Sequence, residues 1–228
     1  MKKIIAFILV FMMILLIYIN YSLKDYDRLS LVITLCLLFM LFLSYFYFEK
    51  GEMGTKEIAL IATLSAFAAA ARVPFAAIPN VQPTTFVVAL AGYVFGCYEG
   101  FLVGATTAFI SNIFLGQGPW TPWQMLGWGV VGIISGALRI RKKFLKAETF
   151  ALICFAYGFL FDWIMNLWHI IGFVRPINLK TIGAAYLTGI TFDILHATGN
   201  FIFAMIFYEK FLKIFLRFKN RLSVTYLK

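Results

Sequence analysis

The sequence predicts an all-α integral membrane protein, and three observations lead to this fold class. Hydrophobic residues make up 62% of the 228-residue chain, and the mean hydropathy is +0.89. Charged residues make up only 13%, too few to coat a soluble globule of this size. The apolar residues are gathered in runs, several of them near the length of about 20 residues that crosses a bilayer as a helix. A bilayer is therefore expected to cover most of the surface.

Eight candidate spans follow one another along the chain, each ended by charge or by Gly or Pro. They are residues 4–21, 29–48, 58–71, 84–97, 100–115, 123–138, 150–172 and 182–208. The first run follows Lys2 and Lys3 and shows no obvious cleavage site, so we interpret it as a retained helix, with a signal peptide as the alternative. The shorter runs indicate tilted or discontinuous helices packed against protein.

The basic residues predict the orientation of these spans. Residues 139–146 and 210–221 are rich in Lys and Arg and lie two spans apart, so both fit the cytoplasmic side. Both termini are then cytoplasmic, as expected for a multi-pass plasma membrane protein. The net charge of +10 follows this topology pattern, so we do not expect nucleic acid as a partner.

The opposite, outer side holds three segments, 72–83, 116–122 and 173–180. They contain all six prolines: Pro74, Pro79, Pro83, Pro119, Pro122 and Pro176. Proline ends helices, so this side is expected to consist of shaped loops, where ligands often bind. Trp120 lies in the second loop and Trp123 directly after it, and both could cover a flat ligand or anchor helices among lipid headgroups.

Small residues recur every four positions on two segments. Ala62, Ala66 and Ala70 stack along one face of a predicted helix, which allows another helix to approach closely. The spacing fits packing within the chain and docking of a partner equally well. A second series consists of glycines, which we interpret as internal packing: Gly92, Gly96, Gly100 and Gly104.

The last two predicted spans each carry a polar face. Asp162, Asn166 and His169 share one face, and Asp193, His196 and Asn200 share the other. Ionisable groups within a membrane indicate a site by default. The alternative is an interhelical Asp–His or Asn clasp that only stabilises the bundle.

Known catalytic and nucleotide-binding motifs are missing from the sequence, which lacks HExxH, GxSxG and the P-loop. The three cysteines have no CxxC spacing, so we predict neither a metal site nor a cofactor. The chain should therefore bind rather than catalyse. An intramembrane enzyme acting on a lipid or prenyl substrate through Asp162 and His196 and an ion-coupled carrier are the alternatives.

A family resemblance rests on the alanine helix and on two strings, residues 80–86 and 111–125. Residues 54–215 resemble the S components of energy-coupling factor (ECF) vitamin transporters, and the two strings resemble the cobalamin or corrinoid branch. The resemblance implies a six-helix domain, preceded here by two further transmembrane helices in residues 1–53 and followed by a basic tail, 216–228. It also implies two kinds of partner, a transmembrane T component and two ATPase subunits.

The sequence thus predicts a binding subunit that captures a vitamin outside and reorients, without covalent chemistry. By the resemblance, Ala62, Ala66 and Ala70 form the docking face for the T component. The predicted pocket comprises Gln82, Asn112, Gln117, Trp120, Trp123, Gln124, Asn166, His169 and His196. Aromatic walls and amides suit a corrin ring, but a flavin, a biotin-like ring or a nucleoside accepts the same groups.

Overall fold

The computed structural model describes residues 14, 15, 17, 18, 22, 26–49, 54–141 and 145–225. Among these residues every regular element is helical and none is a strand, which confirms the all-α class. The first predicted span, 4–21, lies almost entirely outside the described residues.

The helices agree closely with the predicted spans. In chain order they are α2 (Tyr26–Glu49), α3 (Thr55–Arg72), the short 3₁₀ turn η1 (Val73–Phe75), α4 (Thr84–Phe95), α5 (Cys97–Leu115), α6 (Thr121–Arg141), α7 (Ala147–Phe173) and α8 (Leu179–Thr225). Several boundaries follow from the sequence. Pro74 falls in the turn that ends α3, and Gly96 and Gly116 adopt φ of 138° and 108° after α4 and α5, a region that favours glycine.

Four segments in the described part of the chain are long and apolar enough to cross a membrane. They are Arg28–Phe46, Thr55–Phe75, Ala147–Phe173 and Leu179–Arg221. Large apolar side chains such as Phe42, Leu152 and Leu187 are more than 60% exposed on these segments. Such a surface is stable in lipid and not in water, so the chain is a membrane protein with several apolar helices.

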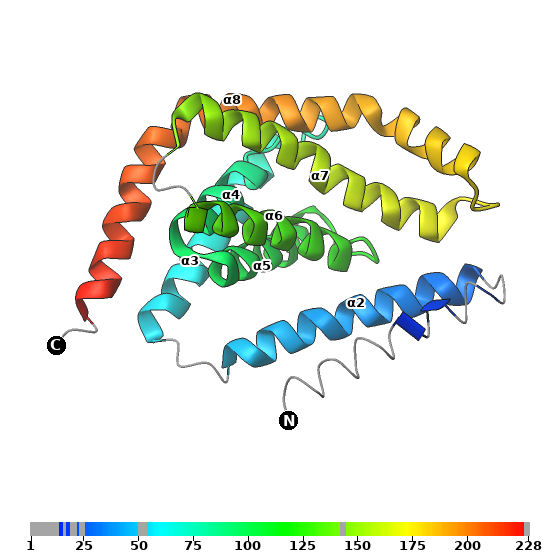
Figure 1. Cartoon of the computed structure of the whole chain (residues 1–228), viewed down its shortest axis with the longest axis horizontal. Coiled ribbons are helices and arrows are strands. Elements are labelled where there is room, and N and C mark those ends of the chain that lie inside the picture. Colours follow the sequence, from blue (N-terminus) through cyan, green and yellow to red (C-terminus); the bar gives the residue numbers. More distant parts are fainter. Residues whose placement is uncertain are drawn as a thin grey trace.

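The short helix α4 forms the centre of the fold. Eleven of its twelve residues are buried, and it packs against α3, α5, α6, α7 and α8. In Figure 1, α4, α5 and α6 lie in the middle, α7 and α8 run side by side across the top, and α2 follows the lower edge. A helix that is apolar all round is expected in such a position.

Glycines allow α4, α5 and α6 to pack backbone against backbone. A Cβ atom on Gly132 would lie 2.2 Å from the carbonyl oxygen of Gly100, and one on Gly100 would lie 2.5 Å from Gly92 Cα. A Cβ on Gly104 would meet the Trp128 carbonyl oxygen at 2.4 Å. The glycine series therefore serves internal packing, as the sequence indicated.

Helix α8 continues well beyond its predicted end at residue 208 and enters the segment assigned to the tail. The chain has no proline or glycine after Gly199, so nothing local stops the helix. Phe215 is buried in the core, and Lys219 donates a hydrogen bond of 2.5 Å to the Val94 carbonyl oxygen. Figure 1 shows this final part of α8 turning away from α7.

Candidate functional site

The proline-rich loops and the basic residues lie at opposite ends of the bundle. At the basic end, Lys219 reaches the end of α4 and the Arg139 guanidinium lies over the Tyr93 ring. At the other end, the α3–α4 loop crosses the bundle, and Asn80 donates hydrogen bonds of 3.0 Å to Asp162 Oδ2 and to the Phe192 carbonyl oxygen. Asn80 has φ of 56°, which asparagine tolerates better than most residues. The loop is thereby fixed against α7 and α8.

Arg72, at the end of α3, is the centre of the polar contacts at this end. Its Nε donates to Gln82 Oε1 at 2.6 Å, and its Nη1 donates to Ser111 Oγ at 2.6 Å and to Asn112 Oδ1 at 2.8 Å. The guanidinium carbon lies 4.9 Å from the centre of the Trp128 ring. The side chain is only 9% exposed, so its position is fixed by α5, α6 and the α3–α4 loop.

Asn112 extends this network to the start of α6. Its Nδ2 donates to Thr121 Oγ1 at 2.9 Å and to Gln124 Oε1 at 2.7 Å. The Thr121 hydroxyl in turn donates to Gln117 Oε1 at 2.9 Å. Four predicted pocket residues therefore belong to one hydrogen-bonded network around Arg72: Gln82, Asn112, Gln117 and Gln124.

Trp128 joins this network to a second one between α7 and α8. Its Nε1 donates to Thr85 Oγ1 at 3.0 Å, and Thr85 lies 2.8 Å from His196 Nε2. His196 Nδ1 lies 3.1 Å from Asp162 Oδ2. The Asp162–His196 contact joins α7 to α8, as expected for an interhelical clasp. The sequence alone had allowed either such a clasp or a functional site.

An open pocket of about 280 Å³ lies beside Arg72. Its wall combines the polar side chains of Arg72, Asn80 and Gln82 with apolar ones. The full lining is Arg72, Phe75, Ala76, Ile78, Asn80, Val81, Gln82 and Leu115. One charged group, two amides and an apolar wall form a small-molecule site of the usual composition.

The other predicted pocket residues lie apart from this lining. Trp120 packs edge-on against Trp168, with ring centres 6.1 Å apart, while Trp123 is 5% exposed in the core. His169 is exposed and stacks on Phe173. His196 is fully buried with both ring nitrogens in contact with partners, so it lies behind the pocket.

Asn166 and Asp193 carry buried polar atoms with no hydrogen-bond partner among the described residues. These atoms are Asn166 Nδ2 and Asp193 Oδ2. The two residues come from α7 and α8, and Asn166 lies against Gly189, one helical turn before Asp193. Neither residue lines the Arg72 pocket.

Arg72 itself was missed by the sequence reasoning, although a signal for it was present. Arg72 interrupts an apolar segment on the side assigned to the outside, where the positive-inside rule predicts few basic residues. Proline follows two positions later, which ends the helix there and leaves the arginine at the mouth of the bundle. An isolated arginine in that position indicates a site.

The predicted docking face lies on the surface of α3. Ala62, Ala66 and Ala70 are all exposed, whereas Ser65, Ala68 and Ala69 on the other face are buried. The alanine series therefore does not serve packing within the described part of the chain.

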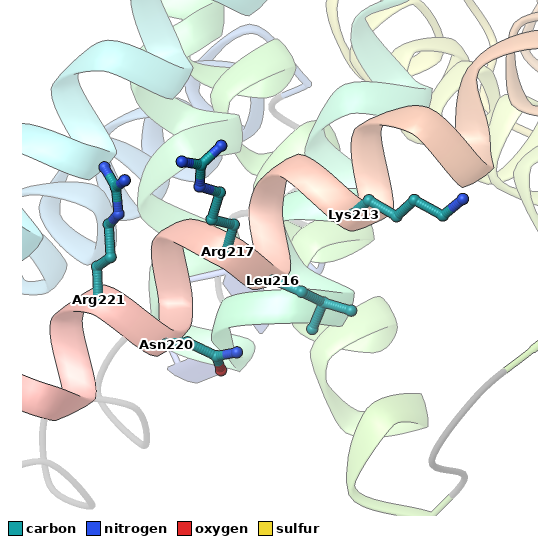
Figure 2. A pocket seen from close by; sticks show the side chains of 5 residues that line it. All are labelled: Lys213, Leu216, Arg217, Asn220 and Arg221. Atoms are coloured by element: carbon teal, nitrogen blue, oxygen red, sulfur yellow. The ribbon is translucent and has the colours of Figure 1, made fainter.

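A surface hollow of about 590 Å³ lies at the basic end, and its lining does not suit a substrate site. All its lining residues come from α8: Lys213, Leu216, Arg217, Asn220 and Arg221. Figure 2 shows that these side chains do not converge, since Arg217 and Arg221 point to one side of the helix and Leu216 and Asn220 to the other. A basic helix face of this kind suits anionic lipid headgroups.

Comparison with known proteins gives a family match over most of the chain. Residues 52–213 match the family model described as ECF-type riboflavin transporter, S component. UPF0397 proteins are 32% identical over 97 residues in Aliivibrio salmonicida strain LFI1238 and 35% identical over 86 residues in Vibrio atlanticus strain LGP32. These alignments cover 40% and 35% of this chain, and 52% and 47% of the relatives.

The chain thus spans about half the length of the curated relatives it matches. No solved structure matches it. The family match supports the S component prediction and gives no support to the corrinoid branch, because the matched model describes riboflavin transporters.

Proposed function

The chain belongs to the family of ECF-type riboflavin transporter S components, and on this premise we propose that it is the substrate-binding subunit of a vitamin uptake transporter. In this proposal the plasma membrane holds residues 54–215 as a six-helix bundle with two further helices before it. Both termini are cytoplasmic, and the pocket beside Arg72 faces outward. The subunit binds and reorients its substrate without covalent chemistry, and a T component with two ATPase subunits supplies the energy.

The pocket beside Arg72 is the observation that carries this proposal. It lies at the end of the bundle opposite the basic residues, which the positive-inside rule assigns to the cytoplasm. Its volume of about 280 Å³ lies near the lower end of the range for small-molecule sites, roughly 300–1,000 Å³. This size favours a flavin over the much larger corrin ring, so a flavin replaces the corrinoid as the proposed substrate.

A binding titration of the purified chain tests this function. Riboflavin fluorescence reports flavin binding, and cyanocobalamin is titrated in parallel by calorimetry. We expect one flavin site and no corrinoid site. Saturable binding of cyanocobalamin without binding of any flavin would return the substrate assignment to the corrinoid branch.

Two glutamines provide a matched pair that locates the site. Gln82 lines the pocket and bonds directly to Arg72, whereas Gln117 is exposed outside the pocket and is linked to Arg72 only through Thr121 and Asn112. Gln82→Ala should weaken flavin binding about 10-fold, the effect of losing roughly one hydrogen bond together with the support it gives Arg72. Gln117→Ala should leave the flavin affinity unchanged. If instead Gln117→Ala weakens binding and Gln82→Ala does not, the site lies at the α5–α6 loop.

An ion-coupled carrier is a second candidate, and one observation favours it. Asp193 is 2% exposed, and its Oδ2 has no hydrogen-bond partner among the described residues. A buried carboxylate inside a membrane bundle is a typical site for a coupling proton or sodium ion. Accumulation by the isolated chain under an ion gradient distinguishes this candidate from the proposed function.

A further inference from the structure

The guanidinium of Arg72 is held rigidly by its surroundings. Three hydrogen bonds fix Nε and Nη1, with partners on the α3–α4 loop and on α5. The Trp128 ring lies 4.9 Å from the guanidinium carbon. Three of the five N–H donors of an arginine are used in this way. The remaining two, on Nη2, make no hydrogen bond to any described residue.

The open pocket gives a ligand access to Arg72, although the residue as a whole is only 9% exposed. Arg72 also lines the open pocket, together with Asn80 and Gln82. The free donors therefore belong to the pocket, and the bonded ones hold the group in place.

The charge of Arg72 has no counter-ion in the described part of the chain. Its hydrogen-bond partners are an amide of Gln82, a hydroxyl of Ser111 and an amide of Asn112, all neutral. The nearest carboxylate in the connected network, Asp162, is bound to His196 and Asn80 and is separated from Arg72 by Trp128, Thr85 and His196. A buried charge without an opposite charge is costly, and a bound anion removes that cost.

We propose that the substrate is a flavin that carries a phosphate, and that Arg72 binds the anionic phosphate oxygens through Nη2. Arginine forms short, charge-assisted hydrogen bonds to phosphate, and its planar group gives such bonds a fixed direction. The apolar side chains of Phe75, Ile78 and Leu115 form the part of the wall that suits the ring system. This inference rests on the proposed function, in which the pocket takes a flavin.

The wild-type chain tests the inference without any substitution. Purified protein is titrated with riboflavin and with flavin mononucleotide, which share the ring and differ in the phosphate. We expect flavin mononucleotide to bind at least about 10-fold more tightly. Equal or tighter binding of riboflavin overturns the inference and leaves the proposed function intact. If neither flavin binds, the flavin assignment made under the proposed function fails together with the inference.

Variants then show whether Arg72 causes the preference. Arg72→Gln should abolish the preference for the phosphate, and Arg72→Lys should reduce it, since the charge stays but the planar fork is lost. Arg175→Gln is the matched control, because it removes an exposed positive charge from the α7–α8 loop outside the pocket. A preference that survives in folded Arg72→Gln protein, or weakening of both flavins by the same factor, assigns Arg72 to the ring carbonyls and contradicts the inference.

Discussion

The role of Asp162 and His196 distinguishes a transporter subunit from an ion-coupled carrier or an enzyme. The last two would use these side chains in ion coupling or catalysis. In the structure both are bound to other residues, Asp162 to His196 and Asn80, and His196 also to Thr85. Polar side chains that bond to one another between helices in this way hold the helices together. We therefore assign this pair to the stability of the fold.

Replacement of Asp162 by Ala tests that assignment. The change leaves His196 Nδ1 without a partner and removes one of the two hydrogen bonds that Asn80 Nδ2 donates, so we expect the free energy of unfolding to fall by about 1–3 kcal/mol. Thermal unfolding in detergent measures it. Glu148→Ala, an exposed acidic site on the same helix α7, should have no effect. Loss of transport at unchanged stability would instead mark Asp162 as an ion-coupling carboxylate.

The helices α4, α5 and α6 depend on close backbone contact, and Gly100 tests it. In Gly100→Ala the new Cβ would lie 2.5 Å from Gly92 Cα and 2.7 Å from the Gly132 carbonyl oxygen, both of them backbone atoms. We expect a loss of about 1–3 kcal/mol in stability. Gly183→Ala in α8 meets nothing within 4 Å and should be neutral or slightly stabilising. Equal melting temperatures for both variants would contradict this packing.

Helix α3 carries the proposed docking face, which a bulky substitution should block. Ala66 is exposed, so Ala66→Trp should fold and bind flavin normally, but it should abolish uptake with the T component and ATPases present. Ala156→Trp, at an exposed alanine of α7, is the matched control and should transport normally. Normal uptake by Ala66→Trp would remove this face from the docking surface.

The helices could be predicted closely from the sequence because apolar runs and breakers are local signals. The predicted end of α8 at residue 208 is too early, because charged residues follow there but no breaker stops the helix. The site could be predicted only in part. The amides of Gln82 and Asn112 were found, but their convergence on Arg72 depends on how α3 and α5 pack, which periodicity does not reveal.

Aromatic residues show the same limit of sequence reasoning. Trp123 was expected over the ligand, yet it is buried in the core, whereas Trp128, which is outside the predicted pocket, links the two polar networks. The sequence shows that these tryptophans are close to one another along the chain. It does not show which face of the following helix turns inward.

At the scale of the whole molecule, the proposed function divides uptake between this chain, which binds the substrate, and partners that supply the energy. It has a pocket at the end of the bundle opposite the basic residues, an exposed small-residue face on α3, and no nucleotide-binding motif in its sequence. These parts fit a division of labour in which recognition resides here and energy comes from partners.

Flavin accumulation in proteoliposomes tests this central claim most directly. The purified chain is reconstituted alone, with an imposed proton or sodium gradient, and then together with a T component, two ATPase subunits and ATP. We predict that the chain alone binds flavin in stoichiometric amounts without accumulating it, and that accumulation begins only with the complete assembly and ATP. Accumulation by the isolated chain under either ion gradient would contradict the account and establish an ion-coupled carrier.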